Sequence, residues 1–334
     1  MQIANNVAER YTRFARQEAE GKSELYVELA LGVAGSEQLI ALLAGLPREK
    51  QQPNLIFAAY RWLFGVPRGW DDFHENVIDR WDDVRNVALS RMTQTNEPGR
   101  CATLLPLLAR LPQPLALIEV GASAGLCLLP DYYSYQFGGT ALPEAPLDDR
   151  PIFSCNTNAV TPVPETLPEI LWRAGLDLNP LDVTNEEEAA WLECLVWPGQ
   201  EARAEQLRKA LEIARAVKPE VVKGDLRADL ADLAGRAPKD ATLVIFHTAV
   251  LTYVQDVSER EAFSHHVSSL CPYWISNESP GVFPSIAQKL EDGGDDHPGK
   301  FLMSMNGEPI AWTDPHGRSV NWIETSAFNA PTPS

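Results

Sequence analysis

The chain has 334 residues, of which 45% are hydrophobic and 22% charged, a composition typical of a globular protein with a sizeable core. Its length suits one large domain or two ordinary ones. The formal net charge is −18, the pI is near 4.7, and Lys and Arg form no stripe along the chain. Because phosphate binding requires clustered basic residues, this composition argues against a nucleic-acid partner.

Cysteine usage and the N-terminus indicate the compartment. Residues 1–16 are polar and charged, unlike a secretory signal, and no uncharged apolar run approaches the ~18 residues of a membrane helix. Single cysteines without a Cys-x-x-Cys pair favour buried thiols over a disulfide framework or a zinc site. We therefore predict a cytoplasmic protein with no membrane contact and no bound metal. The five cysteines are Cys101, Cys127, Cys155, Cys194 and Cys271.

Residues 1–111 are predicted to form a helical N-terminal domain. Leucines recur here at helical spacing, and the stretch 55–64 is an apolar helix candidate closed by Gly65. Ser36 precedes another such stretch and is placed as a helix N-cap. No segment of this region alternates between apolar and polar residues as a half-buried strand does.

Residues 112–326 are predicted to form a second domain around a mainly parallel sheet. Leu115–Val120 is a nearly continuous apolar run, typical of a strand buried on both faces, and it leads into the small-residue turn Gly121–Gly125. We expect a helix directly after this turn, from Leu126. Further strands are expected at 170–178, 221–222, 242–246 and 273–275, with helices between them.

Short motifs place several helix starts. Capping boxes are expected at Thr184 with Glu187 and at Ser258 with Glu261, each opening a helix. The segment 96–98, Asn-Glu-Pro, is expected to cap the helix before the first strand, with its proline at the first helical position.

The remaining segments are a tail and an insertion. Asn306-Gly307 suits a tight turn and predicts a hairpin between strands at 301–305 and 309–312. The Pro-rich segment within 131–168 is expected to be an irregular insertion with one strand at 152–153, and residues 327–334 are expected to be a disordered tail.

The strand and turn at 115–125 form the most informative motif. Small residues at such a turn allow a ligand to approach the backbone closely, and a helix N-terminus behind it favours an electronegative group. An acid two residues before the first glycine, here Glu119, is typical of the first motif of methyltransferases. The dinucleotide fingerprint G-x-G-x-x-G is not matched, because Ser123 and Leu126 stand where its later glycines would be.

Three later strand ends carry groups in the order that a Rossmann-type cofactor site requires. Asp177 ends the second strand, where a carboxylate usually binds ribose hydroxyls. Asp225 ends the third strand, where an adenine amino group could bind, and His247 ends the fourth. Ligand sites lie at the carboxyl ends of parallel strands, so these residues are expected to share one edge.

Nearly the whole chain resembles an uncharacterised bacterial family known only as a domain of unknown function, DUF2332. That family is similar in its core to class I S-adenosylmethionine-dependent methyltransferases, which implies a seven-stranded sheet that ends in an antiparallel hairpin. The segments that carry the resemblance are TNEPGR at 95–100, LIEVGASAGL at 117–126, GLDLNPLD at 175–182, GDL at 224–226, FHT at 246–248 and DPHG at 314–317.

The resemblance implies S-adenosylmethionine as the cofactor and an unknown methyl acceptor, either a small molecule or a protein. His247 would face the sulfonium and act as the catalytic base. The residues expected to bind the cofactor are Glu119, Gly121 and Gly125 at its methionine end, Asp177 at the ribose, Asp225 at the adenine, and in addition Ala122, Ser123, Leu226 and Phe246.

Two other functions stay open. Residues 121–125 also match G-x-S-x-G, the nucleophile elbow of α/β-hydrolases. That fold requires several strands before the elbow, where helices are predicted here. The other alternative is a non-catalytic protein that binds S-adenosylmethionine, a nucleoside or a partner through the same turn. A hydrolase would use Ser123 as nucleophile with Asp256 or Asp295 and His297 or His316.

Overall fold

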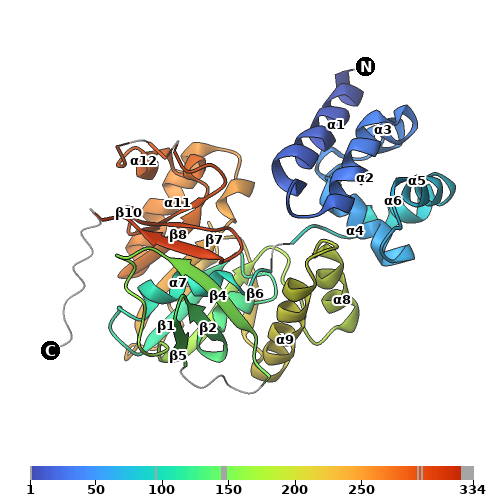
Figure 1. The fold of residues 1–334 in the computed structure, drawn as a ribbon. Coiled ribbons are helices and arrows are strands. Elements are labelled where there is room, and N and C mark those ends of the chain that lie inside the picture. The colour runs from blue at the N-terminus through green and yellow to red at the C-terminus, as the bar shows by residue number, and fades with distance from the viewer. Residues whose placement is uncertain (1, 95, 144–148, 292, 295, 325–334) are drawn as a thin grey trace. The chain divides into compact units, whose positions relative to one another are not determined.

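The computed structural model describes residues 2–94, 96–143, 149–291, 293–294 and 296–324 (Figure 1), and the tail expected at 327–334 lies outside them. The chain forms two compact units. Unit 1 comprises Met1–Gln94 and Asn185–Glu205, and unit 2 comprises Thr95–Thr184 and Gln206–Ser334.

Unit 1 is built from helices around an aromatic core. Tyr26, Phe57 and Phe73 are fully buried at its centre. The predicted cap is confirmed, because Ser36 Oγ accepts the backbone N–H of Leu39. The predicted N-terminal helical region is confirmed by α1 Gln2–Arg13, a π-helical turn at Phe14–Ala19, α2 Glu24–Gly35, α3 Glu37–Ala44, a 3₁₀ turn at Arg48–Lys50, α4 Pro53–Phe64, α5 Trp70–Asp79 and α6 Trp81–Ser90, joined by α8 Glu186–Leu195.

Two further features concern the helices. Helix α7, Arg100–Leu108, is buried along its whole length, and it belongs to unit 2 although sequence analysis grouped it with the N-terminal helices. In the part of the chain that the structure describes, no single helix is long and apolar enough to span a bilayer. The helices α2 and α3 reach that limit only as a pair, which is bent by 86°.

Unit 2 contains one sheet of eleven strands in the order β3-β2-β4-β11-β10-β9-β8-β7-β1-β5-β6. Most neighbouring pairs are parallel, and the strands β8 to β11 pair antiparallel with one another. The strands are β1 Leu115–Val120, β2 Ser134–Phe137, β3 Thr140–Leu142, β4 Ile152–Thr157, β5 Ile170–Asp177, β6 Glu220–Lys223, β7 Thr242–Thr248, β8 Tyr273–Glu278, β9 Phe301–Met305, β10 Glu308–Thr313 and β11 Ser319–Trp322.

Five parallel strands, β6-β5-β1-β7-β8, form the centre of this sheet. Numbered along the chain their spatial order is 3-2-1-4-5, the order of doubly wound folds. The order reverses between β1 and β7, so the carboxyl ends of these two strands form the topological switch point. Ligands of such sheets bind there.

The two faces of the sheet are distinct. Val120 pairs with His247 and faces a core that includes Leu230 of helix α10 (Leu230–Ala234) and Phe263 of helix α11 (Val257–Leu270). Glu119 pairs with Phe246, one residue earlier on each strand. Because side chains alternate along a strand, Glu119 and His247 point to opposite faces.

The helix α9, Glu201–Val217, continues from unit 1 into unit 2.

The C-terminal hairpin is confirmed, and the strand count is corrected. Asn306 and Gly307 have φ angles of 51° and 77°, as the predicted tight turn requires, and they join β9 to β10. The sheet has eleven strands and not the seven that the family resemblance implied. The segment 131–168, expected to be irregular with one strand at 152–153, supplies β2, β3 and β4, and β4 contains that expected strand. The strands β2 and β3, of four and three residues, were not predicted.

The expected helix after the glycine turn is not formed. Leu126–Leu128 is a single 3₁₀ turn, followed by another at Pro130–Tyr132. Pro130 explains the break, because the residue before a proline is disfavoured in helical conformation. The turn at 121–125 therefore has no helix dipole behind it.

Three predicted caps are also misplaced by one to three residues. Asn185 rather than Thr184 caps α8, since its carboxamide oxygen accepts two backbone N–H groups. Asp256 rather than Ser258 caps α11. Helix α7 begins at Arg100 after Gly99, so the segment 96–98 is not its cap.

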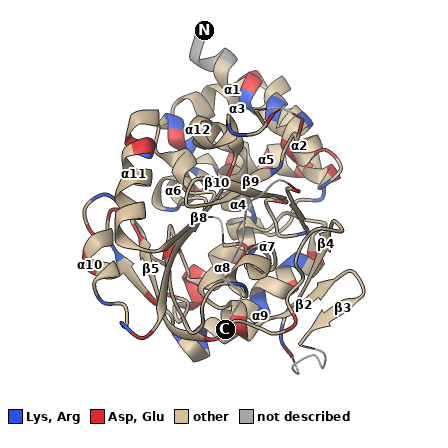
Figure 2. Ribbon diagram, turned by 90° about the vertical axis from the view of Figure 1, so that its left-hand side faces the viewer, with Lys and Arg blue, Asp and Glu red and all other residues tan. Residues whose placement is uncertain are grey.

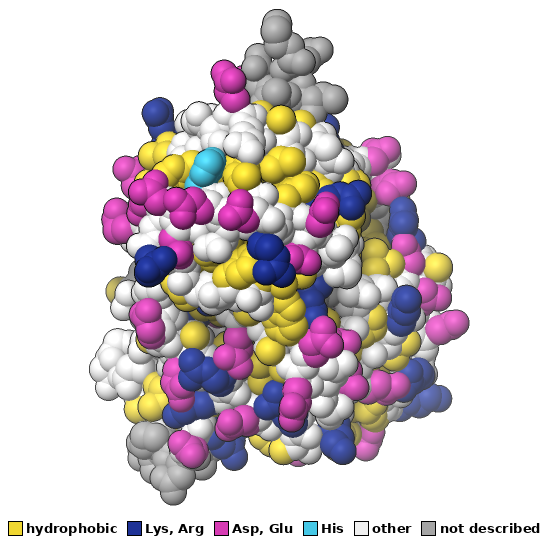
Figure 3. Space-filling model, turned by 90° about the vertical axis from the view of Figure 1, so that its right-hand side faces the viewer, with side chains coloured by type: hydrophobic (Ala, Val, Ile, Leu, Met, Phe, Trp, Pro, Cys, Tyr) yellow, Lys and Arg dark blue, Asp and Glu magenta, His cyan; other side chains and the backbone are white. Residues whose placement is uncertain are grey.

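Charged residues follow the exposed surfaces. Figure 2 shows Lys, Arg, Asp and Glu mainly on helices and loops, with few on the strands. On the face drawn in Figure 3, basic side chains lie among acidic ones, with hydrophobic side chains between them. The acids of unit 2 that are buried are therefore exceptions that require an explanation; they are Glu97, Glu119, Glu278 and Asp314.

Candidate functional site

The turn Gly121–Gly125 saturates its own backbone donors. The N–H groups of Gly121 and Ala122 both reach the carbonyl oxygen of Leu176, at 2.7 and 3.3 Å, and Gly125 N donates to Ala122 O at 2.7 Å. The two remaining N–H groups, of Ser123 and Ala124, donate to side chains described below. A ligand at this turn would therefore be held by side chains and not by free amides.

Packing within the protein accounts for the two glycines of the turn. A Cβ on Gly121 would lie 2.1 Å from a methyl carbon of Val250, and Gly121 has a φ of +75°. A Cβ on Gly125 would lie 3.1 Å from Pro219 and Val221. Ser123 has a φ of 50°, a left-handed conformation that is unfavourable for a residue with a Cβ and that is found most often at functional sites.

Asn96 holds the turn from the opposite side. Its amide nitrogen donates to Ser123 Oγ at 2.8 Å, and its carbonyl oxygen accepts the N–H of Ala124 at 2.9 Å. These two hydrogen bonds fix the strained Ser123. Sequence reasoning interpreted Asn96 as part of a helix cap. The TNEPGR segment did signal its importance, but nothing in the spacing revealed its partner.

A small pocket lies at the topological switch point, and we call it the switch-point pocket. Glu119 is only 5% exposed, and its Oε2 has no hydrogen-bonding partner in the described structure. Burial, and next the neighbouring Cys127, raise the pKa of Glu119 well above its usual value, although Arg100 opposes this shift. The pocket is lined by Asn96, Glu97, Arg100, Glu119, Gly121, Ala122, Leu126, Cys127 and Thr248.

Arg100 ties the pocket to the end of β7. Its Nη1 donates to the carbonyl oxygen and to the Oγ1 of Thr248, at 3.0 and 3.1 Å, and its Nε donates to Pro315 O at 2.9 Å. In the pocket wall, Cys127 Sγ donates to Glu97 O at 3.4 Å. A neighbouring thiol, Cys101, and burial raise the pKa of Cys127 well above its usual value, which makes it a poor nucleophile.

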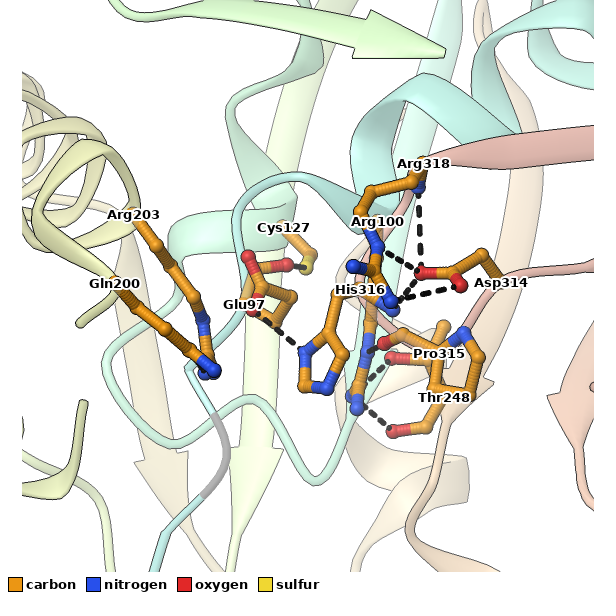
Figure 4. A network of polar contacts seen from close by, with 10 residues as sticks. All are labelled: Glu97, Arg100, Cys127, Gln200, Arg203, Thr248, Asp314, Pro315, His316 and Arg318. Carbon is orange, nitrogen blue, oxygen red and sulfur yellow. Dashed lines mark hydrogen bonds and ion pairs between the residues drawn. The ribbon is translucent and has the colours of Figure 1, made fainter. Parts of the chain in front are cut away.

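A carboxylate–imidazole pair stands beside the pocket (Figure 4). Glu97 Oε2 lies 3.0 Å from His316 Nδ1. The glutamate side chain is 5% exposed and the histidine 33% exposed. His316 was named from the sequence only as a partner for Ser123, and Glu97 was not named as a site residue. The two segments are 219 residues apart, so no local pattern links them.

The two aspartates predicted at strand ends have different environments. Asp177 Oδ2 accepts the N–H of Ser123 at 2.8 Å and Oδ1 accepts that of Asn179 at 2.7 Å, so this residue is joined to the turn. Asp225 pairs with Arg227 at 2.7 Å, and this hydrogen-bonded partner lowers the pKa of Asp225 to about 2. Leu226 beside it is partly exposed.

His247 lies on the other face of the sheet from Glu119. Its Nδ1 is 2.8 Å from Glu278 Oε1, and its ring is fully buried against Phe263, Trp274 and Phe283. Its Nε2 has no partner among the described residues. Phe246, the residue before it, is also fully buried. The catalytic role of His247 stays a prediction, and among the described residues its side-chain contacts do not include any that lines the switch-point pocket.

The residues that a hydrolase would require have other contacts. Ser123 Oγ accepts the amide of Asn96, Asp256 caps α11, and the ring of His297 stacks on Trp312. Asp295 lies outside the described residues. No group of three or more His, Cys, Asp or Glu side chains in the described ranges is arranged to hold a metal ion.

Residues 8–322 match the family described as "uncharacterized protein conserved in bacteria (DUF2332)". The chain belongs to this family. Comparisons with curated proteins and with solved structures gave no match. Four of the segments that carry the resemblance meet in this structure. Asn96 and Asp177 bind the turn at 121–125, and Asn96 and Glu119 line the pocket. Glu97 binds His316 of the fourth segment.

Proposed function

We propose that unit 2 binds S-adenosylmethionine at the switch-point pocket and along the carboxyl ends of β1 and β5, and transfers its methyl group to an acceptor. The observation that carries this proposal is the buried, unpartnered Oε2 of Glu119 in a pocket between β1 and β7. A buried acid with a raised pKa in a pocket at the switch point of a parallel sheet marks a candidate ligand site.

The side chains present fit the chemical groups of this cofactor. Glu119 offers an acceptor to an ammonium group, and such a cation would favour its ionised form. Each oxygen of Asp177 accepts one backbone N–H and keeps a second lone pair for a ribose hydroxyl. The backbone N–H groups of the turn at 121–125 are all used within the protein, so side chains would have to bind the cofactor.

The bound cofactor would supply an electrophilic methyl group. The protein's part is to orient it and to exclude water, which the buried surroundings of Glu119 favour. Asn96 and Asp177 hold Ser123 and Ala124 rigidly from two sides, so the turn is preorganised. A preorganised turn loses little conformational entropy on binding.

Titration calorimetry with S-adenosylhomocysteine, the demethylated product, tests the proposal. We expect saturable heat with the wild-type chain. Asp177→Ala should weaken binding by about 1.5–3 kcal/mol, the usual value of a hydrogen bond to a charged group. Asp232→Ala, on the exposed side of α10, is the matched control and should bind as the wild type does. Wild-type protein without heat at millimolar ligand would refute the proposal.

A non-catalytic binding protein is the alternative that the same pocket permits. It predicts binding of S-adenosylhomocysteine with equal strength and no transfer of labelled methyl groups to a metabolite or protein extract. A serine hydrolase is not favoured by any contact of Ser123, whose hydroxyl is engaged by Asn96.

A further inference from the structure

Two loops cross at the carboxyl edge of the sheet and bring His316 to Glu97. Gly317, with a φ of +84°, passes so close to Gly99 that a Cβ on Gly317 would lie 1.9 Å from the Gly99 carbonyl oxygen. A Cβ on Gly99 would in turn lie 2.7 Å from the His316 carbonyl oxygen. Only glycine allows the two backbones to meet in this way.

Glu97 holds the imidazole of His316, and further contacts hold the loop that carries it (Figure 4). Glu97 Oε2 binds Nδ1 at 3.0 Å, and the backbone N–H of His316 donates to Asp314 Oδ1 at 2.9 Å. The Asp314 carboxylate also pairs with Arg318 at 3.1 Å, and Arg100 holds the carbonyl of Pro315. A ring held in this way loses little freedom when it acts on a bound molecule.

The pairing determines which nitrogen is free. A carboxylate on Nδ1 accepts its proton and leaves the lone pair on Nε2, as in other carboxylate–imidazole pairs that act as bases. His316 Nε2 takes part in none of the described hydrogen bonds, and the ring is one-third exposed. Glu97 itself lines the switch-point pocket, so the base and the pocket share a residue.

We propose that His316 is the general base of this site, that Glu97 is its positioning residue, and that the methyl acceptor presents an O–H or N–H group to His316 Nε2. This inference rests on the proposed methyl transfer. As the acceptor atom forms its bond to the methyl carbon, its proton passes to Nε2. The sulfur–methyl bond breaks, and its electron pair stays on sulfur. The imidazolium then releases the proton to water.

The first test requires neither cofactor nor acceptor. It measures the rate at which the full chain hydrolyses 4-nitrophenyl acetate, an activated ester that reports an accessible, oriented imidazole. His316→Gln should lower this rate by at least about 10-fold, and Glu97→Gln should lower it in the same direction, in line with the ~10²–10⁴-fold usual for a positioned base. His265→Gln, an exposed histidine on α11, is the control and should keep the wild-type rate.

A wild-type rate no higher than that of His316→Gln would overturn the inference. The second test is the tautomer of His316 by ¹⁵N NMR. We expect the proton on Nδ1 in the wild type and a changed tautomer population in Glu97→Gln, even if either variant is destabilised. A proton found on Nε2 contradicts the assignment.

Binding of S-adenosylhomocysteine separates this inference from the proposed function. His316→Gln should bind it within about 2-fold of the wild type, because the base faces the acceptor. If the wild type shows no binding but the ester and NMR results hold, the methyl-transfer proposal fails and the base survives. If binding is normal but the ester rate does not depend on His316, the base fails alone.

Discussion

Two buried acids at the same edge of the sheet differ in how their oxygens are used. Glu278, at the end of β8, accepts three hydrogen bonds on Oε1, from His247 Nδ1 and from the N–H groups of Val250 and Leu251. Glu119, near the end of β1, lines the switch-point pocket and has an oxygen without a partner among the described residues.

The difference separates structure from function. A buried carboxylate that accepts three internal hydrogen bonds stabilises the fold, and here it orders the loop after β7. A buried carboxylate oxygen without a hydrogen-bonding partner lowers the stability of the fold, and such a residue is retained where a ligand supplies the partner. Glu278 and Glu119 should therefore respond in opposite directions to removal of their charge.

The largest expected effect is at Glu278. Glu278→Ala removes the acceptor of His247 and of two backbone N–H groups, so we expect a loss of about 3–5 kcal/mol in the free energy of unfolding. Urea denaturation measures it. Glu278→Gln keeps one oxygen and should lose less. A loss below about 1 kcal/mol for the alanine variant would show that the hydrogen bonds of Glu278 do not stabilise the fold.

The next largest effect is expected where the loops that carry Gly99 and Gly317 cross. Gly317→Ala places a Cβ against the backbone of Gly99, so it should cost about 1–3 kcal/mol of overpacking beyond the cost of the left-handed conformation alone. Gly307→Ala is the matched control, because Gly307 also has a positive φ, +77°, but has no atom within 4 Å of its Cβ position. Equal melting temperatures for the two variants would contradict the close backbone contact between Gly317 and Gly99.

Glu119→Gln is predicted to stabilise the protein. The folded pKa of Glu119 lies above its ordinary value of 4.5, so above that pH the folded state binds more protons than the unfolded state, and stability falls as pH rises. An amide at this position does not titrate. The free energy of unfolding of the variant, relative to that of the wild type, should therefore rise by up to about 1.4 kcal/mol per pH unit until the folded pKa of Glu119 is reached.

Thermal and urea unfolding between pH 5 and pH 8 would measure that slope. Glu212→Gln, on the exposed face of α9, provides the control and should leave the pH dependence as it is. A Glu119→Gln variant less stable than the wild type throughout this range would mean that the carboxylate is satisfied in the folded protein.

The smallest effect is at Asp225. Its pKa is lowered to about 2 by Arg227, so it contributes stability above its ordinary value of 3.8, and this contribution is lost as pH falls towards 2. Arg227 is exposed and Asp225 is partly exposed, so solvent screens the pair and Asp225→Asn should cost less than about 1 kcal/mol at pH 6. Denaturation at pH 6 and pH 3 should show this small difference shrinking. A constant difference would exclude the ion pair as its cause.

Local patterns predicted much of the fold. The run Leu115–Val120 is the central strand with the predicted bounds, because a strand buried on both faces is continuous in apolar character. The Asn306-Gly307 hairpin followed from two residues that tolerate positive φ. By contrast, the helix expected after Gly125 is not formed because Pro130 follows closely, and β2 and β3 are too short to produce a clear alternation.

The candidate site was only partly predictable. Glu119, Ser123 and Asp177 lie together as ligand sites at strand ends do, and sequence order was sufficient to propose them. Asn96, Glu97 and Arg100 line the pocket, and each binds a residue from a distant segment of the chain. Such contacts depend on the fold, and a motif in one segment cannot predict them.

The most direct measurement compares two ligands by titration calorimetry: S-adenosylhomocysteine and 5′-methylthioadenosine, which shares the nucleoside and the sulfur but lacks the amino-acid group. If Glu119 binds the ammonium, the wild type should prefer S-adenosylhomocysteine by about 1.5–3 kcal/mol, and Glu119→Gln should lose most of that preference. Equal affinities of the wild type for both ligands, or no binding of either at millimolar concentration, would contradict the central claim.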